Sequence, residues 1–136
     1  MISSISNRGT LRFMVFTERF NSDVMLRFLK RLLKQMERKV FLIVDGHPVH
    51  RGRAVKKFVA ERKNQIQLFH LPAYSPELNP DEMLNQDVKT NAVRRKPAAT
   101  QIGMLRNLRC YLRSRQRRPE LVKRYFNAPT VRYAAA

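Results

Sequence analysis

Cysteine is nearly absent from this sequence of 136 residues, because Cys110 is the only one. A single cysteine excludes an internal disulfide and a zinc site built on cysteines. Long apolar runs are missing too, and the longest, Val40–Val44, is far too short to cross a bilayer. The first ten residues, MISSISNRGT, contain no apolar segment of signal-peptide length. We therefore expect a cytoplasmic protein that is not embedded in a membrane.

Acidic residues are also scarce. Ten Asp and Glu stand against 28 Lys and Arg, which gives a formal net charge of +18 at pH 7. The residues after 88 carry 13 of the basic side chains and a single acid, Glu120. Such a surplus indicates a nucleic-acid partner, because Lys and Arg neutralise phosphates and release counterions. An anionic membrane surface or an acidic protein is the lesser alternative, and a solvated basic surface without a partner is a third.

The pattern of apolar residues predicts a mixed α/β fold. A turn at Asn7-Arg8-Gly9 separates two short apolar segments, which predicts a hairpin. The continuous run at 40–45 is typical of a strand that is buried on both faces. The predicted strands are 2–6, 10–16, 40–45 and 65–71. The first predicted helix begins at Asn21 or Ser22. The later predicted helices are 53–62, 80 to about 94, and about 98 to 117.

The segment LFHLPAYSPELNPDEMLNQDVK, residues 68–89, contains a proline at every fourth position and then two acids. The prolines stiffen a loop just ahead of Asp81 and Glu82, and they are Pro72, Pro76 and Pro80. Asn79 and Glu82 have the spacing of a capping box at the start of a helix. The loop therefore fixes the direction in which Glu82 points.

Asp45 ends one predicted strand, and Glu82 follows the next strand through the proline loop. Functional side chains of an open α/β sheet gather at the carboxyl ends of its strands. Two carboxylates that meet there suit Mg²⁺, which prefers hard oxygen ligands. We therefore predict that Asp45 and Glu82 lie close together as metal ligands. The alternative is that Glu82 serves only the capping box.

The motif LPAYSPELNPDE closely resembles the signature Leu-Pro-x-Tyr-Ser-Pro-x-Leu-Asn-Pro-x-Glu of mariner-superfamily transposases, especially their bacterial insertion-sequence branch. FLIVDGHPVHRGRAVKKFV resembles the segment around the second catalytic aspartate of that family. SISNRGTLRFMVF and FLKRLL resemble its second and third strands and its first helix. The resemblance covers roughly residues 2–95.

The resemblance implies an RNase H-like mixed sheet with flanking helices and a DDE site that holds two divalent metals, Mg²⁺ or Mn²⁺. Such a site activates water, and then a DNA 3′-hydroxyl, for in-line attack on phosphodiesters. Asp45 matches the second catalytic acid and Glu82 the third, so both are expected to be catalytic residues and metal ligands. Asp81 matches a variable position. Gly46 stands where the family often has Asn, which leaves the ligand intact but loosens its support.

The family's first catalytic aspartate lies on a central strand that precedes the hairpin. Met1 falls within the segment that matches the second strand, and the acids before residue 40, none in a predicted strand, are Glu18, Asp23 and Glu37. The helix-turn-helix domains that recognise transposon ends have no counterpart either. We therefore expect an incomplete sheet and an incomplete metal site. The isolated chain is then expected to be inactive and poorly stable, or to associate with another copy or a full-length relative.

Basic side chains near and after the predicted site are candidates for DNA contact. Lys89 lies two helical turns after Glu82 and could touch a phosphate, although a solvated lysine is the alternative. Relatives often carry a histidine near the position of His50, so we expect His50 to contact DNA or the site carboxylates. A zinc site at His47 and His50 would need further ligands, and only His70 remains. The outward arginines of the predicted helix at 98–117 complete the set: Arg106, Arg109, Arg113 and Arg117.

These features predict a truncated catalytic domain at 1–95 and a basic helical extension at 96–136. The first hypothesis is a fragment of a DNA-cutting and DNA-joining transposase, associated with the nucleoid and inactive alone. The alternative is a non-catalytic basic module that binds DNA, or pairs with a full-length transposase and modulates it. A general RNA-binding protein is a third possibility, which the proline motif disfavours.

Overall fold

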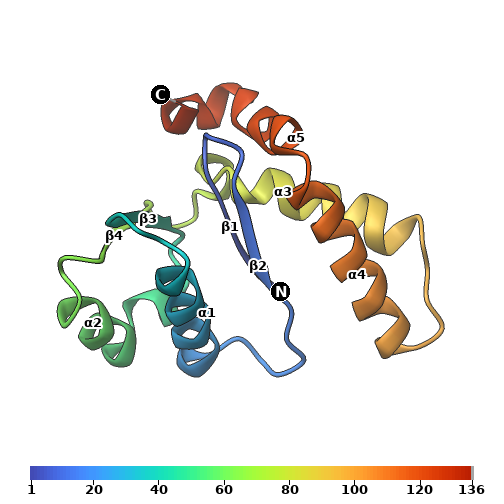
Figure 1. Ribbon diagram of the computed structural model, residues 1–136. Coiled ribbons are helices and arrows are strands. Elements are labelled where there is room, and N and C mark those ends of the chain that lie inside the picture. The colour runs from blue at the N-terminus through green and yellow to red at the C-terminus, as the bar shows by residue number, and fades with distance from the viewer. Residues whose placement is uncertain (136) are drawn as a thin grey trace. The chain divides into compact units, whose positions relative to one another are not determined.

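The computed structural model describes residues 1–135, which form a mixed α/β fold in the predicted order of elements (Figure 1). The strands are β1 (Ile2–Ile5), β2 (Leu11–Met14), β3 (Val40–Val44) and β4 (Ile66–His70). The α-helices are α1 (Ser22–Lys34), α2 (Arg53–Ala60), α3 (Asp81–Val88), α4 (Gln101–Gln116) and α5 (Pro119–Arg124). A π-helical turn, Lys89–Arg94, continues α3 to the end predicted for that helix. No helix within residues 1–135 has the length and apolar character needed to span a membrane.

The chain divides into two compact units. The hairpin unit comprises Met1–Val15 and Glu77–Ala136, and the parallel-strand unit comprises Phe16–Pro76. Each unit has its own two-stranded sheet, and among the described residues no strand pairing joins the two sheets. This arrangement is consistent with a partial RNase H-like domain with flanking helices. The functional boundary expected at residue 95 stays a prediction.

The hairpin is antiparallel, with Ile2 opposite Met14. Gly9 forms its turn with a φ of +91°, a conformation that strains any residue with a side chain. A Cβ at Gly9 would also lie 2.5 Å from the carbonyl oxygen of Pro119, the first residue of α5. Glycine is therefore required both by the turn and by the close approach of α5.

Helices α3, α4 and α5 pack with the hairpin around one apolar cluster. The buried members of this cluster are Leu11, Leu84, Val88, Ala92, Leu112 and Val122. Because Leu112 and Val122 are fully buried, the C-terminal helices contribute to the core of the hairpin unit. The spacing of the apolar residues Ile102, Leu105, Leu108 and Leu112 predicts that all four face inward. Ile102, at the start of α4, is exposed, so the prediction is wrong for this residue. The reason is that the cluster meets the later turns of α4 and not the first.

The parallel-strand unit has the connection expected of a βαβ element. Strands β3 and β4 are parallel, with Val40 opposite Ile66, and α2 lies between them in the sequence. Asn21 caps α1 as predicted, because its side chain accepts a hydrogen bond from the Val24 amide at 3.0 Å. The buried side chains of α1 and α2 are Val24, Met25, Phe28, Leu29, Leu32, Val55 and Phe58.

The prediction that the strand at 40–45 is buried on both faces is wrong for the parallel-strand unit. Val40 and Val44 are buried, whereas Phe41 is 63% exposed and Ile43 is 42% exposed. Successive side chains of a strand point to opposite faces, so one face of β3 is covered and the other is not. A continuous apolar run has no period that could distinguish these two cases.

Candidate functional site

Asp45 directly follows β3 and begins the turn that leads into a short 3-10 helix, Pro48–Arg51. Its Oδ1 accepts a hydrogen bond from the backbone amide of His47 at 2.9 Å. The same oxygen lies 3.0 Å from Nδ1 of His50. Its Oδ2 has no partner among residues 1–135, and the side chain is 45% exposed. One carboxylate oxygen is therefore held by the protein while the other remains open to a ligand.

His50 is the buried polar residue beside this carboxylate, with only 8% of its surface exposed. Its Nδ1 also lies 3.3 Å from the backbone oxygen of Asp45. The ring of Phe20 meets the rings of His47 and His50 edge-on. The expected contact between His50 and a site carboxylate is thus present at Asp45, and burial against Phe20 restricts the orientation of the imidazole. A contact between His50 and DNA stays a prediction.

The proline loop contains the one non-glycine residue with a positive φ among residues 1–135. Tyr74 has a φ of 56° and its side chain is fully exposed. A left-handed conformation costs a residue with a side chain roughly 1–2 kcal/mol. Strain of this kind is found at functional sites, where the surrounding structure compensates for it. Tyr74 is therefore a functional candidate that the spacing of the prolines did not reveal.

Glu82 lies in the first turn of α3 and is partly buried. Its Oε1 accepts a hydrogen bond from the side-chain amide of Asn85 at 3.3 Å, and its Oε2 has no partner among the described residues. The Asn79 side chain bonds the Asp81 amide at 3.1 Å, and the Glu82 carboxylate does not bond the Asn79 amide. The expected capping box is therefore not formed, because the two side chains find other partners.

Asp81 has a different role from its neighbour. The hydroxyl of Ser3, on β1, lies 2.9 Å from both carboxylate oxygens of Asp81. This contact ties the start of α3 to the hairpin. The expectation that Asp81 is not a metal ligand stays a prediction.

The two candidate metal ligands belong to different units: Asp45 to the parallel-strand unit and Glu82 to the hairpin unit. Their predicted closeness stays a prediction. Within residues 1–135, no three His, Cys, Asp or Glu side chains gather into a group that could hold a metal ion. Both carboxylates nevertheless suit a hard divalent cation, because each presents one open oxygen.

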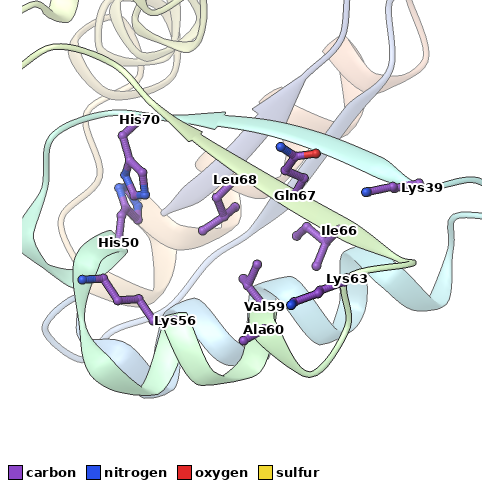
Figure 2. A pocket seen from close by; sticks show the side chains of 10 residues that line it. All are labelled: Lys39, His50, Lys56, Val59, Ala60, Lys63, Ile66, Gln67, Leu68 and His70. Carbon is purple, nitrogen blue, oxygen red and sulfur yellow. The ribbon is translucent and has the colours of Figure 1, made fainter.

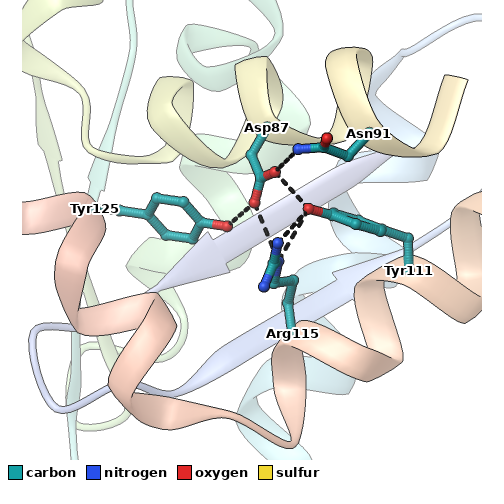
Figure 3. Close-up of polar contacts among 5 residues, drawn as sticks. All are labelled: Asp87, Asn91, Tyr111, Arg115 and Tyr125. Carbon is teal, nitrogen blue, oxygen red and sulfur yellow. Dashed lines mark hydrogen bonds and ion pairs between the residues drawn. The ribbon is translucent and has the colours of Figure 1, made fainter. Parts of the chain in front are cut away.

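A polar network around Asp87 joins α3 to the C-terminal helices (Figure 3). The carboxylate accepts hydrogen bonds from the hydroxyls of Tyr111 and Tyr125 and, at 2.6 Å, from the amide of Asn91. Arg115 Nε lies 3.1 Å from the same carboxylate. Asp87 therefore receives donors from the π-helical turn that continues α3, from α4 and from the residue that follows α5.

This network shifts the pKa of its members. Burial alone would raise the pKa of Asp87, but hydrogen bonds from Tyr111, Tyr125 and Asn91 and the charge of Arg115 outweigh it, and the pKa is lowered. Burial and the Asp87 carboxylate both raise the pKa of the Tyr125 hydroxyl. Asp87 is therefore ionised and the tyrosines are neutral over most of the accessible pH range.

The predicted DNA-contacting residues of the hairpin unit are all on its surface. Lys89 is exposed at the first residue of the π-helical turn. Three arginines of α4 and the arginine that caps its C-terminus are exposed, lie at helical spacing on one face, and form no ion pair with residues 1–135. These residues, the arginine face of α4, are Arg106, Arg109, Arg113 and Arg117. Arg115 differs because it is committed to Asp87. The outward orientation predicted for the four arginines is confirmed.

Comparison with protein families gives one match. The model of the DDE superfamily endonucleases matches residues 1–104. The chain belongs to the DDE superfamily endonucleases. Searches of curated proteins and of solved structures found no match. A DDE endonuclease acts on DNA and generally uses divalent metals, so the open oxygens of Asp45 and Glu82 fit the chemistry of the family.

The match extends past residue 95 into the start of α4. Sequence reasoning missed the Asp87 network, which holds this helix. Its signal is weak, because the i, i+4 pairs Asp87–Asn91 and Tyr111–Arg115 are common on helices. Only the fold brings residues 24 and 38 positions apart into contact with one carboxylate.

We predict that Asp87→Ala lowers the free energy of unfolding by about 2–3 kcal/mol, because it leaves the Arg115 charge and two tyrosine hydroxyls without their acceptor. Tyr125→Phe should cost about 1 kcal/mol. Urea denaturation followed by circular dichroism measures both. Tyr74→Phe is the matched control, because its hydroxyl is exposed, and it should change nothing. An unchanged midpoint for Asp87→Ala would show that the network adds no stability.

The same network predicts the pH dependence of stability. The pKa of Asp87 is lowered in the folded state, so its contribution is present above about pH 4 and is lost as pH falls further. The pKa of Tyr125 is raised, so its contribution is present below about pH 10 and is lost at higher pH. The stability difference between the wild type and Tyr125→Phe should therefore be constant from about pH 5 to 9 and shrink above 10.

Proposed function

We propose that this DDE endonuclease chain is a fragment of a mariner-type transposase of the bacterial insertion-sequence branch. In this proposal Asp45 and Glu82 hold Mg²⁺ or Mn²⁺ during the cleavage and joining of DNA phosphodiesters. The observation that carries the proposal is the state of Asp45 at the end of β3, with Oδ1 held and Oδ2 open. The family match supports the reaction class.

The chain's own residues prepare the site in distinct ways. His50 and the His47 amide hold Oδ1, so Asp45 keeps its orientation without help from an ion. Asn85 does the same for one oxygen of Glu82. When bound, the divalent ion would polarise the phosphate and activate the attacking oxygen. Lys89 is proposed to contact a phosphate near Glu82.

A DDE site has three carboxylates, and we propose that the third comes from outside these 136 residues, on a strand that pairs with β1 or β3. Each of these strands has one partner and thus one unpaired edge among the described residues. The exposed Phe41 and Ile43 add an apolar face to β3. Unpaired edges of this kind attract further strands. A full-length relative would supply both strand and acid, whereas a second copy would cover the edge without the acid.

The second candidate function is a non-catalytic DNA-binding or transposase-pairing module. The observation that favours it is the exposed arginine face of α4, which does not depend on the acids. In this reading the chain competes for DNA or for a relative's open strand edge. The two candidates differ in whether Asp45 and Glu82 affect any measured activity.

We predict that the 136-residue chain does not nick plasmid or transposon-end DNA in Mg²⁺ or Mn²⁺ above the level of its Asp45→Asn/Glu82→Gln variant. Two carboxylates are too few for a two-metal site. Nicking measured by gel electrophoresis provides the test. Nicking that disappears in Glu82→Gln but persists in Asp81→Asn would contradict the incomplete site while supporting the role of Glu82. Glu18 would then be the first acid to test as the replacement.

We also predict weak and sequence-tolerant binding to duplex DNA, carried largely by the arginines of α4. Replacing all four with Gln should lower the slope of log affinity against log salt by about 3.6, because each phosphate contact contributes roughly 0.9. A filter-binding titration measures this slope. Point substitutions are needed because removal of residues 97–136 would also remove Leu112 and Val122 from the core.

The matched control removes the same number of exposed charges from the parallel-strand unit, with Gln at Lys30, Arg31, Lys34 and Arg38. It should change the slope by less than about 1. An equal decrease of the salt slope in the two fourfold variants would mean that DNA binding is spread over the whole basic surface.

A further inference from the structure

The parallel-strand unit contains an open cavity of about 430 Å³ beside β4 and α2 (Figure 2). Val59, Ala60, Ile66 and Leu68 form its apolar part. Its polar lining consists of Lys39, Lys56, Lys63, His50, His70 and Gln67. All ten residues belong to the same unit, so the cavity is a property of that unit alone.

The charge of the lining has one sign. Three lysines and two histidines line the cavity, and no Asp or Glu does. None of these lysines forms an ion pair with residues 1–135. Burial, followed by the charges of Arg51, His50 and Lys56, lowers the pKa of His70. The electrostatic potential of the cavity is therefore positive, and a bound anion would offset the repulsion among its cationic side chains.

The shape and the distribution of charge indicate which anion fits. Lys56 and His70 lie toward one end of the cavity, and Lys39 lies toward the other (Figure 2). Consecutive phosphates of a strand could contact lysines at both ends. The apolar part offers a surface for a sugar or a base, and the open rim admits a polymer.

His50 connects this cavity with the candidate metal ligand. Its ring lines the cavity, and its Nδ1 contacts the carboxylate of Asp45 at 3.0 Å. A strand in the cavity would therefore pass one side chain away from Asp45. The cavity therefore lies next to the carboxylate that is proposed to hold the metal.

We propose that the cavity between α2 and β4 is a nucleotide-binding subsite that holds one strand of the DNA substrate through Lys39, Lys56 and Lys63. The assignment of DNA as the ligand rests on the proposed function. In this role the lysines contact successive phosphates, and the apolar part contacts the intervening nucleoside. The subsite is separate from the arginine face of α4, which lies in the other unit.

The test is binding of a thymidine tetranucleotide without divalent metal, followed by NMR of the histidine rings. The chain has only three histidines, and His70→Gln identifies the signal of His70. We expect the signal of His70 to move and its pKa to rise on binding, because the phosphates offset the charges of Arg51 and Lys56. A His70 signal that does not respond at saturating tetranucleotide would overturn the proposal.

The affinity for the tetranucleotide is compared among double variants in α2 and the loop that follows it. Lys56→Gln/Lys63→Gln should weaken tetranucleotide binding by about tenfold and lower the salt slope by about 1, since single-strand phosphates contribute roughly 0.7 each. Lys56→Arg/Lys63→Arg should retain binding. Arg53→Gln/Lys57→Gln removes two exposed charges of α2 outside the cavity and should change affinity less than twofold. Equal losses in the two Gln variants would contradict a defined subsite.

Two further probes distinguish DNA from other anions, and a chelator separates this proposal from the metal site. Inorganic phosphate or an acidic peptide that binds as tightly as the tetranucleotide would show a general anion site and overturn the assignment. Tetranucleotide binding should persist in excess EDTA, because it requires no metal. A failed metal site would thus leave this result unchanged, and a failed subsite would leave metal binding unchanged.

Discussion

The contact of His50 with Asp45 is the interaction on which the account of the site depends. A carboxylate at a strand end is ordinarily free to rotate, and an ion would then have to order it at a cost in entropy. In this chain, Nδ1 of His50 and the His47 amide both meet Oδ1 at 2.9–3.0 Å, and Phe20 packs against the two rings. The open oxygen is thereby oriented before any ligand arrives. Hydrogen bonds that orient a carboxylate in this way are typical of metal ligands.

Asp87 has a comparable importance for the hairpin unit. It lies on the same helix as Glu82 and receives donors from α4 and from the end of α5. The helix that carries the candidate ligand and the helix that carries the exposed arginines are therefore fixed to each other. A DNA strand held by α4 would have a defined position relative to Glu82. The C-terminal helices therefore add charge and also form part of the unit that carries Glu82.

The sequence predicted the order of the elements because period and turn residues are local properties. Asp45 at a strand end and Glu82 in a first helical turn were found in this way. The exposure of Phe41 was not predictable, since an apolar run carries no information about which layers cover it. The Asp87 network was not predictable because it is formed by residues that are distant in the sequence. The same holds for the cavity, which forms where β4 lies beside Lys56. The conformation of Tyr74 follows from the loop as a whole and not from its residue type.

The most direct test of the central claim, a metal site shared by Asp45 and Glu82, is paramagnetic broadening of backbone amide signals during a titration with Mn²⁺. The amides of Gly46 and Met83 report on the two acids separately. If the site is shared, both signals broaden with the same midpoint, and Asp45→Asn abolishes the broadening at Met83 as well as at Gly46. Asp81→Asn should leave both unaffected. Loss of broadening only at Gly46 in Asp45→Asn, with Met83 unchanged, would contradict a shared site.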